Sequence, residues 1–220
     1  MNKILVIAPH PDDETLGCGG ILLRHKAEGD EVHWLIVTGP NEDYGWSAEQ
    51  VRNRAEEINQ VSASYGFIKT HNLALPAVRL DTLPMTELIE KVGSIIKTLQ
   101  PEVLYVPCPC DVHTDHKIIA QVVNACTKWF RCQSVRRVLA YETLSETDFN
   151  RIGEVFRPNV FIDISRYLDR KIEIMKIYTS EVGDFPFPRS EKTIRALAFL
   201  RGSQSGYHAA EAFQLLFERI

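Results

Sequence analysis

Residues 4–14 read ILVIAPHPDDE, an apolar run that ends in a polar cluster. Such a run is typical of a buried strand, and the cluster after it then lies at the carboxyl end of that strand, where α/β sheets bind their ligands. Pro9 and Pro11 restrict φ and remove backbone donors, so we expect a loop that holds its shape without sheet or helix bonding. The chemistry of the chain is therefore predicted at this loop.

His10 and Asp13 are spaced so that a tight turn can direct an imidazole and a carboxylate at one cation. A catalytic zinc site usually takes three protein ligands and leaves one position open for water. A second cluster, His113-Thr114-Asp115-His116, follows another apolar run, Val103–Val106, so the two loops are expected to meet at one sheet edge. From the residues alone, the third ligand is either His113 or His116.

Both clusters also have a purely structural interpretation. An Asp-containing turn after a strand commonly caps the helix that follows. In the second cluster, Thr114 or Asp115 would be the N-cap of a helix over Ile118–Trp129. The two interpretations are compatible, because a cap and a metal ligand can share one loop.

Two motifs, PHPDDE at 9–14 and HTDH at 113–116, resemble those of the LmbE-like, or PIG-L, family of zinc-dependent N-deacetylases. Arg54 with Glu57, and Gly206 with the AEAF run at 210–213, extend the resemblance over nearly the whole chain. The resemblance implies removal of an N-acetyl group from an amino sugar, and a C-terminal region that returns toward the active site and subunit contacts.

The resemblance also implies a role for each matched residue. The zinc ligands would be His10, Asp13 and His116. The catalytic residues would be Asp12 as general base, His113, which would stabilise the oxyanion if its ring is protonated, and Asp115, which would orient His113. Amide hydrolysis by an activated water needs these groups: a base, a Lewis acid on the carbonyl oxygen, and a proton for the leaving amine.

Arg54 has two interpretations. It lies three residues before Glu57 in a predicted helix, Ala48–Tyr65, where the two side chains could form a surface ion pair of little energetic value. The resemblance instead implies that Arg54 is in the substrate pocket, where a guanidinium binds hydroxyl or carboxylate oxygens bidentately. Tyr44 and Trp46, on the preceding loop, are candidates for a wall that stacks against a sugar, or for simple packing.

The alternation of strand and helix patterns over the first two-thirds predicts an α/β fold: a Rossmann-like, mostly parallel sheet with helices on both faces. The predicted strands are Ile4–Ala8, Glu31–Val37, a short one near His71–Leu73, Val103–Val106, Arg136–Glu142 and Val160–Ile164. The predicted helices are Thr15–Glu28, Ala48–Tyr65, one from Asp81 or Thr82 to Leu99, His116–Phe130, Ser165–Tyr178 and Ser190–Arg201. The stretch Thr143–Pro158 is predicted to be irregular, with Glu142 and Glu146 solvated.

Three glycines in the first helix, Gly17, Gly19 and Gly20, have the wrong spacing for a dinucleotide fingerprint, so we interpret them as sites of close helix packing. Near the C-terminus, Tyr207 and His208 are candidates for the pocket rim, and His208 is not predicted to be a ligand. The apolar residues that follow suit a subunit interface and a core equally: Phe213, Leu215, Leu216 and Phe217.

Composition limits the partners. With 220 residues and a net charge of −4, we expect a single domain over residues 1–220 and no basic field for nucleic acid. The N-terminal apolar run is too short for a signal peptide, and no run approaches a membrane span, so a cytoplasmic location is expected by default. The expected partner is a small amino-sugar conjugate, and homo-oligomerisation is left open.

The five cysteines are an odd number without a secretory signal, which predicts reduced thiols. Cys108 and Cys110 lie near His113, but a one-residue spacing around proline is poor for a zinc knuckle, so buried apolar thiols are favoured.

Two alternative functions follow from the same residues. One is a zinc hydrolase that cleaves another amide or an ester, because an activated water attacks several electrophiles. The other is a non-catalytic sugar-binding protein, which we would expect to have lost the base or a ligand, whereas His10, Asp12, Asp13 and His116 are all present. The identity of the sugar is not encoded in a recognisable motif.

Overall fold

Seven strands form one sheet in the computed structural model, which describes all residues from Met1 to Ile220. The strand order is β3-β2-β1-β4-β5-β7-β6. The pairings among β3, β2, β1, β4 and β5 are parallel, whereas β7 is antiparallel to both of its neighbours, β5 and β6. The predicted mostly parallel α/β sheet is confirmed.

The strands are β1 (Lys3–Ala8), β2 (Glu31–Gly39), β3 (Lys69–Pro76), β4 (Val103–Pro107), β5 (Arg137–Tyr141), β6 (Val160–Asp163) and β7 (Ala210–Glu218). The α-helices are α1 (Asp13–Glu28), α2 (Ala48–Tyr65), α3 (Met85–Leu99), α4 (Thr114–Cys126), α5 (Leu168–Met175) and α6 (Glu191–Ser205), and short 3₁₀ turns, η1 and η2, cover Glu42–Tyr44 and Leu80–Thr82. No helix combines the length and the apolar character needed to cross a membrane.

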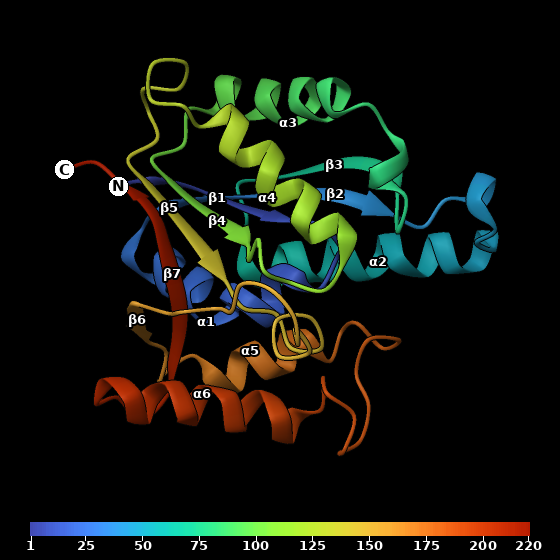
Figure 1. Cartoon of the computed structure of the whole chain (residues 1–220). Helices are drawn as coiled ribbons and strands as arrows, with labels where there is room; N and C mark the ends of the chain where they lie inside the picture. Colours follow the sequence, from blue (N-terminus) through green and yellow to red (C-terminus); the bar gives the residue numbers. More distant parts are fainter.

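Helices cover both faces of the sheet (Figure 1). α3 and α4 lie on one face and α1 and α2 on the other, where α5 and α6 add a further layer. β1 lies inside the sheet between β2 and β4, and its side chains alternate between the two apolar cores: Ile4 and Val6 are buried in one, and Leu5 and Ile7 in the other. Since β1 and β4 are parallel neighbours, the loops after them share one sheet edge, as the sequence predicts.

The glycines of α1 allow very close packing. A Cβ on Gly17 would lie 2.3 Å from Cδ2 of Tyr141 on β5, and one on Gly20 would lie 2.5 Å from Cγ2 of Ile164. Carbon atoms in contact are normally separated by about 3.5–4.0 Å. The packing interpretation of these glycines is therefore confirmed.

β7 is the main element that the sequence patterns missed. It inserts antiparallel between β5 and β6, and α6 lies against it. Phe213 is fully buried in the core, whereas Leu216 is 43% exposed. The apolar C-terminal run is thus a strand, and the first part of it belongs to the core.

A buried ion pair connects β7 to the helices beneath the sheet. Glu211 accepts hydrogen bonds from the backbone amides of Gly20 (2.7 Å) and Ile21 (2.8 Å) in α1, and from Nζ of Lys171 in α5 (2.7 Å). Lys171 also donates to the carbonyl oxygen of Leu16 (2.8 Å). Both charged residues are 5% exposed, so the charge of each is compensated by the other and not by water.

Some predicted boundaries were wrong. The third helix was expected to begin at Asp81 or Thr82, but these residues belong to η2, and α3 begins at Met85 because Pro84 disfavours helical backbone at Leu83. The fourth helix ends at Cys126, and α5 is shorter than the predicted helix at both ends.

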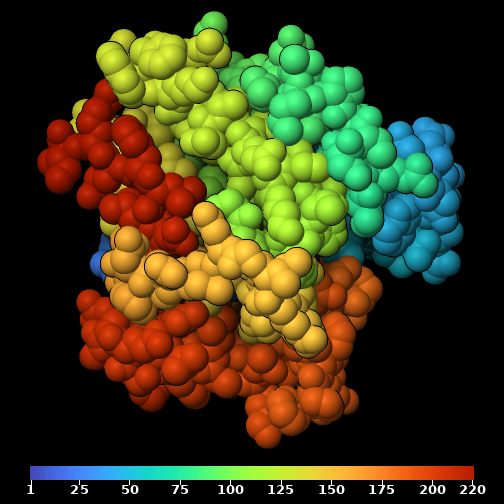
Figure 2. Space-filling model, in the orientation of Figure 1, coloured from blue at the N-terminus to red at the C-terminus, as the bar shows by residue number.

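The segment between β5 and β6 is irregular, as predicted, and crosses the surface as the amber strip in Figure 2. The prediction that its glutamates are solvated was wrong. Glu142 pairs with Arg201, and Glu146 lines the cavity described below.

The prediction of reduced thiols was wrong for two of the five cysteines. Cys108 and Cys110, in the loop after β4, are joined by a disulfide, whereas Cys18, Cys126 and Cys132 are free. The two sulfur atoms meet because the loop folds back on itself over a single proline.

Candidate active site

The loop after β1 is held by neighbouring elements. Thr38 on β2 donates both its amide (2.9 Å) and its hydroxyl (2.8 Å) to the carbonyl oxygen of Pro9, and Arg54 on α2 donates to that of Pro11 (3.0 Å). Asp12 has φ 137° and ψ −29°, a conformation that L residues rarely adopt. Strain of this kind persists where surrounding contacts fix it, which is common at functional sites.

Three ligand atoms converge beside this loop. His10 Nδ1 lies 3.3 Å from Asp13 Oδ2, Asp13 Oδ2 lies 3.2 Å from His116 Nε2, and the two ring nitrogens are 3.3 Å apart. In a tetrahedral zinc site with bonds of about 2.0–2.1 Å, neighbouring ligand atoms are about 3.3–3.4 Å apart. The donor set of His10, Asp13 and His116 therefore fits one divalent cation, and a second group that could hold one, His10, His113 and Asp115, lies beside it.

Burial raises the pKa of Asp13, but the charge of His116 and the hydrogen bonds from both histidines outweigh burial and hold the pKa below its usual range. Asp13 is therefore an ionised carboxylate, the form that binds a cation.

His10 and His116 each contact a further carboxylate through the other ring nitrogen. His10 Nε2 lies 3.1 Å from Asp115 Oδ2, and His116 Nδ1 lies 2.7 Å from Asp111 Oδ2. Both aspartates are fully buried. Carboxylates placed in this way fix the tautomer and the orientation of metal-binding histidines.

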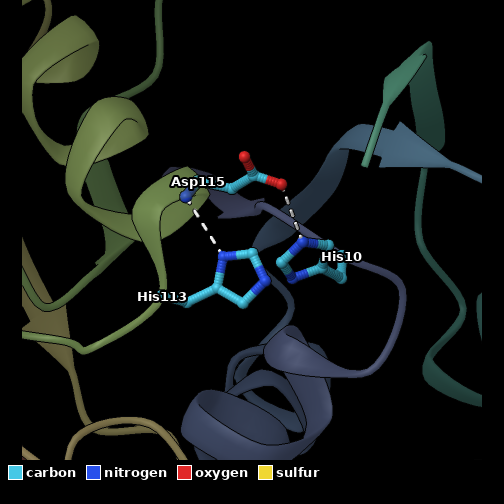
Figure 3. A group of neighbouring side chains, drawn as sticks. All are labelled: His10, His113 and Asp115. Atoms are coloured by element: carbon cyan, nitrogen blue, oxygen red, sulfur yellow. Dashed lines mark hydrogen bonds and ion pairs between the residues drawn. The ribbon is translucent and has the colours of Figure 1, made fainter. Parts of the chain in front are cut away.

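The predicted contact between the Asp115 carboxylate and His113 is not observed. Figure 3 shows that the carboxylate points to His10, while only the backbone amide of Asp115 donates to His113 Nδ1 (3.1 Å). The carboxylate also accepts from the amides of Val78 (2.7 Å) and Leu80 (3.2 Å). The expected role of Asp115 is corrected accordingly: it orients His10, and His113 is instead held as the N-cap residue of α4.

The surroundings of His113 favour its neutral form, whereas its oxyanion role was framed for a protonated ring. Burial, together with the charges of His10 and His116, lowers the pKa of His113 to about 4. Because Nδ1 accepts the hydrogen bond from Asp115, the ring proton is on Nε2. His113 can therefore donate one hydrogen bond from Nε2 into the cavity that it lines.

Asp12 is 4% exposed and lines the same cavity, with Oδ2 3.4 Å from a guanidinium nitrogen of Arg189. Burial, with the charges of Asp13 and Glu181, raises its pKa well above the usual range. A carboxylate with a raised pKa can both accept and return a proton near neutral pH.

Arg54 lines the cavity, and its predicted ion pair with Glu57 is also present, with Nε 3.2 Å from Oε2. Its other donors bind the Pro11 carbonyl, the hydroxyl of Ser180 (3.0 Å) and the carboxylate of Glu181. The two interpretations of Arg54 therefore hold together, and its guanidinium connects the loop of Asp12 to residues 180 and 181.

The cavity has a volume of about 430 Å³ and connects the three ligand atoms to the surface. Trp46 lines it and is 42% exposed, whereas Tyr44 lies under the guanidinium of Arg79 and outside the cavity. Tyr207 and His208 do not line the cavity, and His208 packs against Phe199. Trp46 is thus the aromatic residue positioned to contact a ligand.

A family model described as "PIG-L: GlcNAc-PI de-N-acetylase" matches residues 5–127, which include both loops of the site. The chain belongs to the PIG-L family.

Relatives are similar over nearly the whole chain. A diacetylchitobiose deacetylase of Thermococcus kodakarensis is 24% identical over 98% of this chain and 84% of its own length. Among solved structures, the conserved protein TT1542 of Thermus thermophilus has a TM-score of 0.79 at 26% identity, covering 100% of this chain and 97% of its own. The 4-carboxy-2-hydroxymuconate hydratase GalB of Pseudomonas putida has the same TM-score at 17% identity, covering 100% and 98%, so the fold alone does not determine the reaction.

Four residues at this PIG-L site were missed by sequence reasoning: Asp111, Glu146, Glu181 and Arg189. All four lie outside regular helices and strands, where no periodicity identifies a side chain that points into a cavity. Only Asp111 had a usable signal, since it lies two residues before the HTDH motif in the loop after β4.

Replacing Asp111 with asparagine is expected to weaken metal binding about 10–100-fold, because His116 loses the carboxylate that fixes its ring. Affinity is measured by competition with a chromophoric chelator. Glu154→Gln, an exposed acid outside the cavity, is the control. Unchanged affinity in Asp111→Asn would show that the carboxylate does not support His116.

Proposed function

We propose that the chain is a zinc-dependent hydrolase that removes the acetyl group from an N-acetylated amino sugar. The observation that carries this proposal is the triangle of His10, Asp13 and His116 beside a buried, cavity-lining Asp12. Membership of the PIG-L family and the similarity to a diacetylchitobiose deacetylase support the amide as the bond that is cleaved.

His10, Asp13 and His116 would hold the zinc ion. When bound, zinc polarises a carbonyl group and lowers the pKa of water. Asp111 and Asp115 keep the two imidazoles oriented toward the ion.

Asp12 is the proposed general base. Its carboxylate takes a proton from the attacking water and passes it to the leaving nitrogen, so that the amide and water become acetate and a free amine. Arg189 and the hydrogen bond from the Asp12 amide to Glu14 (3.1 Å) restrict where this carboxylate can move. His113 donates from Nε2 to the carbonyl oxygen as negative charge develops there, an effect worth about 10²–10³ in rate for a single donor.

We assign Arg54 to positioning, through its bond to the Pro11 carbonyl, in addition to its place in the substrate cavity. Trp46 offers an exposed aromatic face on which a sugar ring can stack.

The test is acetate release from N-acetylglucosamine and N,N′-diacetylchitobiose. The protein is stripped with a chelator, assayed, reloaded with zinc and assayed again. We expect activity only after reloading. Equal release by the stripped protein, or no release with zinc or any other divalent metal on either substrate, would contradict the proposal.

A further inference from the structure

The charged side chains around the cavity bear on the charge of the substrate. Besides Asp12 and Asp13, three carboxylates line the walls: Glu57, Glu146 and Glu181. The cationic side chains that line it, apart from histidines, are Arg54 and Arg189, and no lysine does. Recognition of an anionic group normally uses arginine or lysine donors that are free to bind it.

Both arginines are already paired with carboxylates of the cavity, although Nε of Arg189 is buried without a partner. Arg54 contacts Glu57 and Glu181 and uses further donors on Pro11 and Ser180. Arg189 contacts Glu181 Oε2 (3.1 Å) and Asp12 Oδ2 (3.4 Å). An anionic substrate group at either guanidinium would therefore lie beside a carboxylate that already contacts the same guanidinium.

Glu146 is different, because its charge is not compensated. Its carboxylate has a single weak partner, the hydroxyl of Ser145 at 3.5 Å. Its backbone is fixed, since its amide donates to the carbonyl of Thr143 (3.1 Å) and its carbonyl accepts from the amide of Val112 (3.3 Å) in the loop that also carries His113. Glu146 lines the cavity, and the segment that carries it crosses the surface as the amber strip in Figure 2. Burial raises the pKa of its carboxyl group, so its negative charge is present once the pH exceeds that raised pKa.

We propose that the group joined to the N-acetylated sugar carries no negative charge, and that Glu146 is the residue that selects against anionic conjugates. This inference rests on the proposed function for the identity of the sugar. The matching substrates are neutral saccharides or those with an ammonium group, which a lone carboxylate attracts. Phosphate- or carboxylate-bearing conjugates meet repulsion from this carboxylate.

The test compares two probes of similar size, methyl N-acetylglucosaminide and N-acetylglucosamine 1-phosphate. Binding is measured by calorimetry on zinc-loaded Asp12→Asn, in which turnover is suppressed, and acetate release on wild type, both at about pH 8, where carboxylates are ionised. We expect the neutral probe to bind at least about tenfold more tightly. When Glu146→Gln is added to Asp12→Asn, the ratio between the affinities for the two probes should fall severalfold. Adding Glu154→Gln, which lies on the same strip but is exposed and outside the cavity, should leave this ratio unchanged.

The outcomes separate the two proposals. Failure of the neutral probe to bind, equal or tighter binding of the phosphate, or a ratio that Glu146→Gln leaves unchanged would each overturn the charge inference. Selective binding of the neutral probe without acetate release by wild type would support the charge inference and refute the deacetylase.

Discussion

Asp12→Asn is expected to lower kcat for acetate release by about 10²–10⁴, while zinc remains bound. Asparagine keeps the size of the side chain but cannot accept a proton from water at neutral pH. It also suits the backbone, because Asn tolerates the positive φ of this position better than most residues. The loss should therefore report the missing base and not a collapsed loop. Steady-state kinetics and metal analysis on the same preparation measure both quantities.

The control is Asp43→Asn, an exposed acid in η1 outside the cavity, which should leave kcat unchanged. If Asp12→Asn retains most of the wild-type rate with zinc bound, another group must take the proton and the assignment of Asp12 is wrong. If it loses zinc, the residue is needed for the metal site and its role as a base has to be tested on another variant.

Glu211→Ala is expected to lower the free energy of unfolding by about 3–5 kcal/mol, the usual cost of removing one partner of a buried ion pair. The substitution leaves the ammonium of Lys171 buried with only the Leu16 carbonyl, and deprives the amides of Gly20 and Ile21 of their acceptor. A loss of this size is a large part of the stability of an ordinary domain, about 5–15 kcal/mol. Urea denaturation at low temperature, followed by circular dichroism, measures it.

The same strand provides a matched control. Glu218 pairs with Arg137 at the surface (3.2 Å, with both side chains more than a third exposed), so Glu218→Gln should cost less than about 1 kcal/mol. Glu211→Gln keeps an acceptor for one amide, so its free energy of unfolding should fall less than that of Glu211→Ala. It can be compared with Glu218→Gln even if the alanine variant does not fold. If substitutions at positions 211 and 218 lower the free energy of unfolding equally, the buried ion pair stabilises the fold no more than the exposed one.

Most of the parallel part of the fold was predictable because β1, β2 and β4 are apolar runs and the first two helices end at a glycine, Gly29 after α1 and Gly66 after α2. β7 was not, since its burial depends on which sheet edge it reaches, and half of its side chains are only partly buried. The start of α3 was missed because Pro84 disfavours helical backbone at the residue before it, and this effect outweighs the apolar periodicity of the preceding residues.

The convergence of the two loops was also predictable, because parallel neighbours place their carboxyl ends together. The partner of each imidazole was not. The carboxylate of Asp115 contacts His10 and not its near neighbour His113, a choice set by how α4 begins and by the amides of Val78 and Leu80. The ion pairs of Arg54 with Glu181 and of Arg189 with Asp12 likewise join residues more than a hundred positions apart in sequence.

The central claim is that His10, Asp13 and His116 together bind one metal ion, and a zinc titration of chelator-stripped protein tests it most directly. We expect wild type and His208→Ala, an exposed histidine outside the site, to bind one equivalent, and His116→Ala to bind at least about 100-fold more weakly while keeping a native circular dichroism spectrum. No binding by wild type, or undiminished binding by folded His116→Ala, would contradict the account.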